Sequence, residues 1–244
     1  MKRDILYKII AAALAVSVLA LTGCSKTEES SDVKSATNTS QAMESTAENN
    51  AESTEKTDSE VSGEGNNILI AYFTAAENSG VDAASSASYS IVNGEAKGRI
   101  RALADMIQAE TGGELFSIQT SVVYPSDGGE LINYADQEQS DNARPELTSH
   151  IENLDAYDTI FVGYPNWWYD MPQAMYSFFD EYDFGGKTII PFNSHNGSRF
   201  SDTIETIQEL EPNANVITNG FTVNERDVPD AAGDIAEWID GLGY

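Results

Sequence analysis

Continuous apolar runs of strand length alternate with helical apolar periods from residue 67 onward, and this alternation most constrains how the chain can fold. The first run, Asn67–Phe73, has no polar residue after its first position. Runs of this kind are typical of strands buried on both faces, as in parallel sheets. Similar runs occur at Glu114–Gln119, Thr159–Gly163, Thr188–Phe192 and Asn215–Thr218.

Apolar residues spaced three and four apart lie between these runs and predict helices. They form four stripes, at residues 100–107, 171–182, 200–210 and 235–242. Strands that alternate with helices favour a three-layer α/β/α sandwich around a parallel sheet. Five strands fit the flavodoxin-like order 2-1-3-4-5, although the pattern alone does not determine that order. We therefore predict one α/β domain over residues 67–244, without an internal repeat.

Ligands of such sheets bind outside the carboxyl ends of the strands, near the point where the strand order reverses. Functional residues are therefore expected just after Phe73, Gly163 and Phe192, where the first, third and fourth predicted strands end.

The first 24 residues have the pattern of an export signal. Basic residues at positions 2, 3 and 8 precede an apolar run, Ile9–Leu21, which is too short for a comfortable membrane span. The run ends in Leu21-Thr22-Gly23-Cys24, which resembles the lipobox of bacterial lipoproteins. The resemblance implies that residues 1–23 are a signal peptide, that Cys24 carries a lipid, and that the domain is extracytoplasmic and lipid-anchored to the bacterial membrane. The alternative is an ordinary signal peptide that happens to contain a cysteine.

Residues 24–66 follow as a segment rich in Ser, Thr, Glu, Asn and Ala, with almost no large apolar side chain. Such a segment buries too little surface to offset the entropy of ordering it, so we expect a disordered acidic linker between the lipid and the domain. Cys24 is the only cysteine, which excludes an intramolecular disulfide, a Cys-x-x-Cys redox pair and a thiolate zinc site. With only two histidines in the chain, we expect no metal site, and any electron chemistry must come from a bound cofactor.

The chain is strongly acidic. Residues 1–24 hold three basic residues and one acidic residue, so the remainder has 10 basic against 39 acidic residues, a net charge of −29. Nucleic acid and anionic lipid head groups would repel such a surface. It suits a basic protein partner, or it serves only to keep the domain soluble.

Four aromatic residues stand close together after the third predicted strand, in Tyr164-Pro165-Asn166-Trp167-Trp168-Tyr169-Asp170-Met171-Pro172. No helical or strand period places them all in a core, whereas a flat aromatic ligand would explain them, because ring stacking contributes about 0.5–1.5 kcal/mol beyond burial. The alternative is that one of the two tryptophans packs beneath the neighbouring helix, and the sequence does not say which.

Tyr-Pro-x-Trp-Trp followed by Met-Pro resembles the loop that flanks the flavin ring in a flavodoxin family. Further stretches similar to that family are Ile68–Thr74, Tyr124-Pro125, Ala143–Leu147 and Tyr182–Phe192. The resemblance extends over nearly all of residues 67–244. It implies a flavodoxin-like domain that binds flavin mononucleotide (FMN), with Pro165, Asn166, Trp167 and Trp168 beside the ring.

The loop after the fourth strand, Asn193-Ser194-His195-Asn196-Gly197-Ser198, is similar to the family's Thr/Ser-His-x-Gly-Ser loop, which closes over the other side of the flavin. The resemblance makes Asn193, Ser194, His195, Gly197 and Ser198 candidate cofactor contacts. His195 is also a candidate proton donor, since a histidine ordinarily titrates near neutrality. The alternative for His195 is a structural hydrogen bond.

The phosphate loop departs from the family pattern. Flavodoxins usually continue the first strand with Ser/Thr-x-Thr-Gly-Asn-Thr, which wraps the phosphate at a helix N-terminus. Here Thr74 and Ala75 begin that loop, but a Ser- and Ala-rich insertion, Gly80–Lys97, follows and could be a flap. We expect the helix to start near Lys97-Gly98-Arg99, whose amides and cations would then receive the phosphate unless they are only solvated.

Three functions are consistent with these features. The first is an FMN-binding electron-transfer protein tethered to the outer side of the membrane, acting either as a carrier for a redox partner protein or as a reductase of quinones or other small acceptors. The second is a cofactor-free flavodoxin fold that serves as an interaction or ligand-binding module. The third, a hydrolase, lacks a Gly-x-Ser-x-Gly elbow, a Walker-type loop and a cysteine nucleophile.

Overall fold

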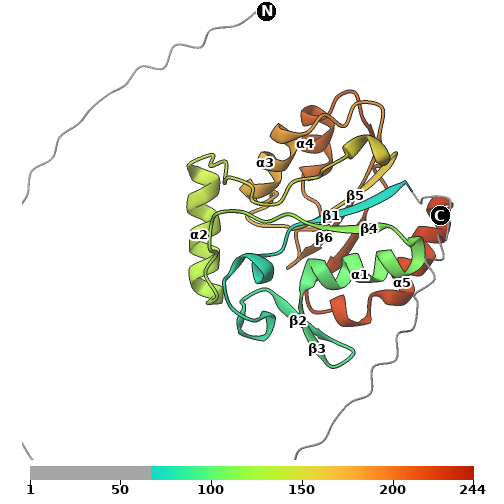
Figure 1. Ribbon diagram of the computed structural model, residues 1–244. Helices are drawn as coiled ribbons and strands as arrows, with labels where there is room; N and C mark the ends of the chain where they lie inside the picture. Colours follow the sequence, from blue (N-terminus) through green and yellow to red (C-terminus); the bar gives the residue numbers. More distant parts are fainter. Residues whose placement is uncertain (1–66) are drawn as a thin grey trace, which may run out of the picture. The chain divides into compact units, whose positions relative to one another are not determined.

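A sheet of parallel strands organises residues 67–244, the part of the chain that the computed structural model describes (Figure 1). The predicted signal peptide, the lipidation site at Cys24 and the linker at residues 24–66 lie outside the described residues. No helix among residues 67–244 is long and apolar enough to cross a bilayer.

The strands run in the order β4-β1-β5-β6, and two further strands, β7 and β8, both pair with β6. All these pairings are parallel. The parallel strands therefore stand in the order 2-1-3-4-5, with the fifth position shared by two pieces, which confirms the predicted fold class. The bounds are β1 Ile68–Tyr72, β4 Glu114–Ser117, β5 Thr159–Pro165, β6 Thr188–His195, β7 Asn215–Val216 and β8 Phe221–Asn224.

Side chains of β1 alternate between two apolar cores, because successive residues of a strand point to opposite faces. Ile70 and Tyr72 belong to the core with α1 and α5, whereas Leu69 and Ala71 belong to the core with α3 and α4. Figure 1 shows these two helix pairs on opposite sides of the sheet. The helices span α1 Arg99–Thr111, α3 Gln173–Glu181, α4 Thr203–Leu210 and α5 Ala232–Leu242, and short 3-10 turns lie at η1 Ala75–Asn78, η2 Ala83–Ser85, η3 Leu154–Ala156 and η4 Val228–Asp230.

The fifth strand is broken at Gly220. A Cβ added there would lie 2.5 Å from the carbonyl oxygen of Pro191 and 2.8 Å from the ring of Phe200, so only a glycine fits this close approach. The chain pairs with the start of β6 before the glycine and with the end of β6 after it. The sequence predicted only the first piece.

A β-hairpin occupies part of the insertion after β1. Strands β2 (Tyr89–Val92) and β3 (Glu95–Gly98) pair antiparallel. The turn between them is Asn93-Gly94, with positive φ at both residues (52° and 85°), as a two-residue hairpin of this type requires. The Asn-Gly signal was present in the sequence, but the insertion was interpreted only as a flap. Helix α1 begins at Arg99, close to the predicted start.

Helix α2 (Gly128–Ser140) was not predicted, and it lies apart from the other helices in Figure 1. The Asp127 side chain caps it, accepting hydrogen bonds from the amides of Gly129 (2.9 Å) and Glu130 (3.0 Å). An Asp followed by Glu three residues later is a capping signature that the sequence did contain. The two adjacent glycines and a weak apolar period obscured it.

Replacing Asp127 by alanine is expected to lower the free energy of unfolding by about 1 kcal/mol, because two amides at the start of α2 lose their acceptor. Urea denaturation measures this loss. Asp136→Ala, at an exposed position of the same helix, removes the same charge without touching the cap and is the matched control. Equal losses for the two variants would contradict a capping role.

Candidate functional site

A pocket of about 310 Å³ lies where the strands β5, β6 and β8 end. Pro165 closes β5, Ser194 and His195 close β6, and Glu225 follows β8 directly. This is the carboxyl edge at which doubly wound sheets hold ligands, and the volume lies at the small end of the range for small-molecule sites. The remaining lining residues are Ala87, Ser88, Arg99, Gly128, Leu131, Ile132, Ala135, Asn166, Trp167, Trp168 and Asn196.

The two tryptophans have different surroundings. Trp167 is partly buried and makes ring contacts with Phe73 (5.7 Å between centroids, nearly perpendicular) and Tyr124 (5.8 Å). Trp168 is 46% exposed, and its indole nitrogen donates to the carbonyl of Ile132 on α2 (3.0 Å). Trp167 therefore joins the core to the pocket wall, while Trp168 forms the rim. The structure thus identifies which tryptophan packs into the core.

The turn that carries Trp168 is strained. The amide of Trp167 donates to the carbonyl of Asp170 and the amide of Asp170 donates back (2.9 and 3.0 Å), so Trp168 and Tyr169 are the two central residues of a tight hairpin turn. Both have positive φ (52° and 65°), where Asn-Gly is the usual pair. Such conformations cost on the order of 1–3 kcal/mol each and gather at functional sites. The Asp170 carboxylate holds the turn by accepting hydrogen bonds from the Tyr176 hydroxyl (2.9 Å) and from the Met171 amide (2.7 Å).

Asn166 links the two loops of the pocket. Its side-chain nitrogen donates to the carbonyl of Arg199 (2.9 Å) and to the hydroxyl of Ser201 (3.3 Å), in the loop after β6. These bonds orient the amide so that its oxygen, Oδ1, is buried and has no hydrogen-bond partner. A buried acceptor left without a donor is costly, so a ligand with an N–H group fits here.

Of the five cofactor contacts predicted in residues 193–198, Ser194 and His195, at the end of β6, line the pocket. Asn193 is fully buried, and its amide donates to the Arg199 carbonyl (3.0 Å) and accepts from the Thr222 hydroxyl (2.6 Å), which is a structural role. Gly197 and Ser198 lie outside the pocket lining.

His195 has a defined tautomer in this loop. The amide of Gly197 donates to its Nδ1 (2.8 Å), so the neutral ring carries its proton on Nε2. Burial, and next the positive charge of Arg199, lower the pKa of His195, while the carboxylates of Asp227 and Glu225 oppose this. The neutral ring is thereby favoured at neutral pH, and Nε2–H is the group that His195 can offer a ligand.

The predicted phosphate-binding residues after β1 do not line the pocket. Thr74 and Ala75 are buried, and the Thr74 hydroxyl accepts from the amide of Ala76 (3.4 Å), which closes the loop into η1. Gly98 packs directly on Thr74, because a Cβ at Gly98 would lie 2.4 Å from the Thr74 hydroxyl oxygen.

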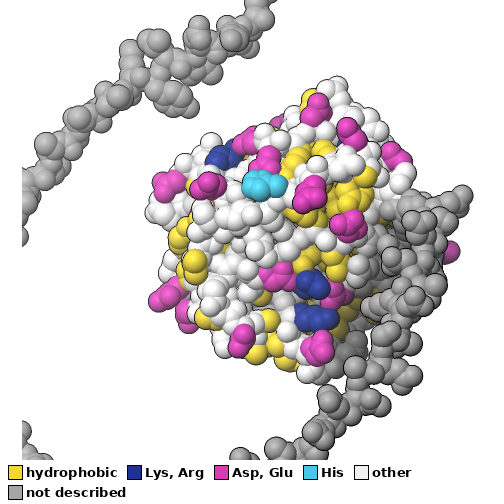
Figure 2. Space-filling view, in the orientation of Figure 1, with side chains coloured by type: hydrophobic (Ala, Val, Ile, Leu, Met, Phe, Trp, Pro, Cys, Tyr) yellow, Lys and Arg dark blue, Asp and Glu magenta, His cyan; other side chains and the backbone are white. Residues whose placement is uncertain are grey.

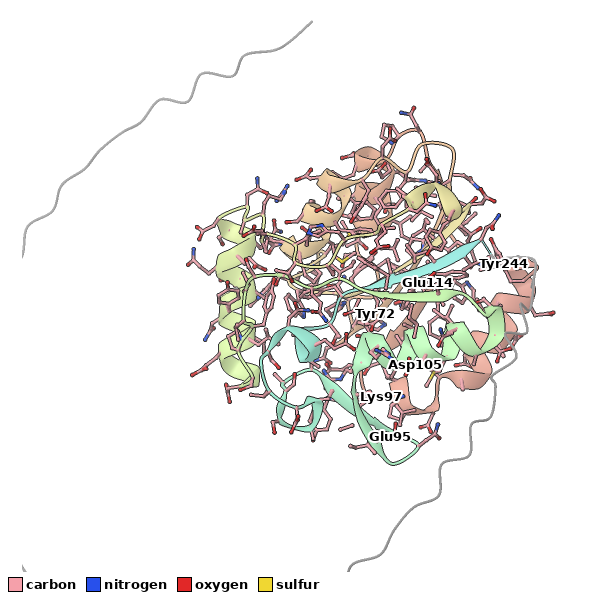
Figure 3. All side chains as sticks on the ribbon, viewed as in Figure 1. Tyr72, Glu95, Lys97, Asp105, Glu114 and Tyr244 are labelled. Carbon is pink, nitrogen blue, oxygen red and sulfur yellow. The ribbon has the colours of Figure 1, made fainter. Side chains whose placement is uncertain are left out.

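The basic residues at the start of α1 are paired with carboxylates. Lys97 donates to Asp105 (2.7 Å; Figure 3), and this bond raises the pKa of its ammonium group. Arg99 alone of the three predicted residues 97–99 lines the pocket, where its guanidinium contacts Glu225 at 2.9 Å. Its Nε is buried and has no partner.

Several lining residues were missed by the sequence interpretation. Leu131, Ile132 and Ala135 form an apolar wall from α2, Ala87 and Ser88 come from the insertion, and Glu225 comes from the end of β8. The spacing of Leu131 and Ala135 by four residues after a capping Asp was the available signal for α2. Nothing in the sequence pointed to Glu225, because β8 itself was not predicted.

A buried carboxylate of α2 is connected to the pocket wall through a tyrosine. Glu138 of α2 is 6% exposed and accepts from the hydroxyl of Tyr124 (3.1 Å), whose ring contacts Trp167. Burial raises the pKa of Glu138 above its ordinary value of 4.5. A carboxyl whose pKa is higher in the folded state stabilises most below its unfolded pKa, and this contribution is lost as the pH rises through the folded value.

Glu138→Gln is therefore expected to be more stable relative to the natural protein at pH 7.5 than at pH 4. The amide avoids the cost of burying a charge and can still accept from Tyr124. Urea midpoints of both proteins across this range measure the difference. A difference that stays constant with pH would show that Glu138 does not titrate with a raised pKa.

The fold and the pocket define this chain as a doubly wound α/β protein with a pocket at the carboxyl edge of its sheet. Residues 87–242 match the flavodoxin family, and the chain belongs to that family. This confirms that the chain has the flavodoxin-like domain predicted from the sequence.

Three crystal structures illustrate the relationship. A candidate flavoprotein from Bacteroides uniformis is 27% identical, with 71% of this chain and 97% of that chain covered and a TM-score of 0.54. A second candidate flavoprotein, from Bacteroides eggerthii, is 27% identical over 69% and 97% of the chains, with a TM-score of 0.49. A flavoprotein from Lactobacillus acidophilus in complex with FMN is 18% identical over 68% and 97%, with a TM-score of 0.47. No curated protein matches the chain.

Proposed function

We propose that the domain binds FMN in the pocket at the carboxyl edge of the sheet and uses it to transfer electrons. The observation that carries this proposal is the composition of the pocket wall. Two tryptophans on one loop face an apolar stretch of α2, and the polar residues Asn166, Ser194 and His195 stand beside them. A flat ring with polar edges is the ligand that such a wall suits.

The residues present fit a flavin ring. The orphaned Oδ1 of Asn166 can accept from an N–H group of the ring, and the Nε2–H of His195 can donate to a ring carbonyl or nitrogen. Trp168 is exposed at the rim, where it can cover the ring and exclude water. FMN would supply the electron-accepting chemistry, while these residues bind and orient it.

The surface charge supports a proposal for the class of electron partner. Figure 2 shows acidic side chains scattered over the visible face, and the few basic ones lie beside acidic neighbours. A basic redox protein would be attracted to such a surface, and an uncharged small acceptor such as a quinone would not be repelled. The domain is thus a carrier or an FMN-dependent reductase.

Flavin titration of the full chain, purified in detergent, tests the proposal. Addition of the protein to FMN is expected to quench the flavin fluorescence and shift its visible absorbance band, because the ring moves from water to a stacked aromatic site. Asn166→Ala should weaken binding, whereas Asn142→Ala, at an exposed turn outside the pocket lining, should not. A folded protein without any flavin response would refute the electron-transfer function.

A folded protein that shows no flavin response would favour the alternative function, an interaction module that has lost its cofactor. The observation on its side is the closed loop after β1, where Thr74 and Gly98 fill the space between them. The tryptophans that line the pocket argue against this alternative function.

We also propose that the domain is held on the outer side of the membrane through a lipid on Cys24. The proposal is based on Leu21-Thr22-Gly23-Cys24 and on the acidic linker that follows. Cys24→Ser is expected to move the protein from the membrane fraction to the soluble fraction and to prevent incorporation of a labelled fatty acid. Unchanged membrane association of this variant would contradict the anchor.

A further inference from the structure

We propose that Glu225 controls whether the pocket recognises the phosphate of a flavin, so that the natural protein binds riboflavin nearly as tightly as FMN. The inference rests on the proposed function and concerns the same pocket. Glu225 would thereby be a specificity-determining residue. It directly follows β8, and the folding of the chain brings it to the pocket.

The two basic residues on either side of Arg99 in the sequence are already engaged. Lys97 lies 2.7 Å from Asp105 and 3.6 Å from Glu95. Arg101 contacts Asp105 at 2.6 Å and Glu77 at 3.4 Å. These side chains do not line the pocket, so neither Lys97 nor Arg101 meets a ligand there.

Arg99 is the one Lys or Arg among the described lining residues, and its guanidinium is held by Glu225 at 2.9 Å. Their side chains are 23% and 29% exposed, so water screens this pair only partly. The backbone amide of Glu225 donates to the carbonyl of His195 (2.8 Å), and this bond links Glu225 to the end of β6. The backbone of Glu225 is thus fixed at the pocket edge, where its carboxylate lies beside Arg99.

Other phosphate-binding groups are occupied too. The Thr74 hydroxyl accepts from the Ala76 amide, and the Arg99 amide at the start of α1 donates to the carbonyl of Ser88 (3.1 Å). Among the described lining residues, Arg99 is accordingly the Lys or Arg side chain that can attract a phosphate dianion. The Arg99 Nε is buried, so the phosphate would meet the terminal guanidinium nitrogens, one of which already contacts Glu225.

Binding of the phosphate then exchanges one ion pair for another. The phosphate dianion forms an ion pair with Arg99, but the Glu225 carboxylate then loses its own ion pair with Arg99. The carboxylate also repels the phosphate at close range. The two effects oppose each other, so the phosphate adds little to the affinity that the ring already provides. Removing the charge of Glu225 frees Arg99 and removes the repulsion together.

The test compares the Kd values of FMN and riboflavin for the full chain by fluorescence titration. The natural protein is expected to bind the two flavins within about threefold of each other. Glu225→Gln should tighten FMN by about tenfold, the equivalent of one charge-assisted hydrogen bond, and leave riboflavin unchanged. Adding Arg99→Gln to this variant should abolish the gain.

Asp227→Asn is the matched control, because it removes the same charge two residues away at a position without a contact to Arg99. A natural protein that prefers FMN by a large factor, or a Glu225→Gln variant that behaves like Asp227→Asn, would overturn the inference while leaving the proposed function intact. A protein that binds neither flavin would overturn both.

Discussion

Replacing Trp167 by alanine is expected to lower the free energy of unfolding by about 3 kcal/mol, whereas Trp168→Ala should cost less than about 1 kcal/mol. Trp167 contacts Phe73 and Tyr124, and its loss leaves a cavity between the core and the pocket. Trp168 is 46% exposed and loses mainly one hydrogen bond to Ile132. Chemical denaturation measures both.

Flavin binding should respond differently. Trp168→Ala is expected to weaken binding about tenfold, since stacking and some ring burial are lost while the fold persists. Trp167→Ala should weaken it further, because the pocket wall itself collapses. Trp167→Phe keeps an aromatic ring in contact with Phe73, so it should recover most of the free energy of unfolding. This variant can be compared with Trp168→Ala if Trp167→Ala fails to fold. Equal unfolding free energies for the two alanine variants would contradict the division of roles.

Gly163→Ala is expected to destabilise the domain by about 3 kcal/mol, at the upper end of the usual cost of overpacking. Gly163 lies in β5 opposite Phe192 of β6, and a Cβ there would be 2.1 Å from the fully buried Phe192 ring. Because the Phe192 ring is fully buried, it cannot move out into solvent to avoid the added methyl group. Because β5 and β6 end in Pro165 and Ser194, the same change should also weaken flavin binding.

Gly233→Ala is the control, because nothing lies within 4 Å of the added methyl group on the exposed side of α5. It should raise the free energy of unfolding by about 0.5–1 kcal/mol, the usual gain from removing a helical glycine. Phe192→Leu, introduced into the Gly163→Ala background, should restore part of the loss through a double-mutant coupling. Additive effects of these two substitutions would show that the clash with Phe192 is not the cause.

The central sheet could be predicted because its signal is local. Ile68–Tyr72 is apolar at every position, and a strand buried on both faces needs that composition. The loops that follow β5 and β6 were located for the same reason, since parallel strands bring their carboxyl ends to one edge. The broken fifth strand escaped prediction because Gly220 is needed for a contact with Pro191, far away in the sequence.

The tryptophan pair shows where local information ends. The sequence indicated that one of Trp167 and Trp168 is core, but both have the same neighbours along the chain. The choice depends on Phe73 and Tyr124, which reach Trp167 from two distant segments. The wall of α2 was missed because its two initial glycines weaken the helical signal that Asp127 provides.

The sequence by itself determined the α/β class, the strands β1, β4, β5 and β6 with the helices α1, α3, α4 and α5, and the loops at the ends of β5 and β6, because apolar periodicity depends on residues that are close together in the chain. Only the tertiary structure decided the electrostatics of the site. The sequence made residues 97–99 look equally suited to bind a phosphate. In the folded domain, however, Lys97 forms an ion pair with Asp105, Gly98 packs on Thr74, and Arg99 forms an ion pair with Glu225. The strength of a charge depends on what lies within a few ångströms of it, and those neighbours come from parts of the chain that the sequence does not place together.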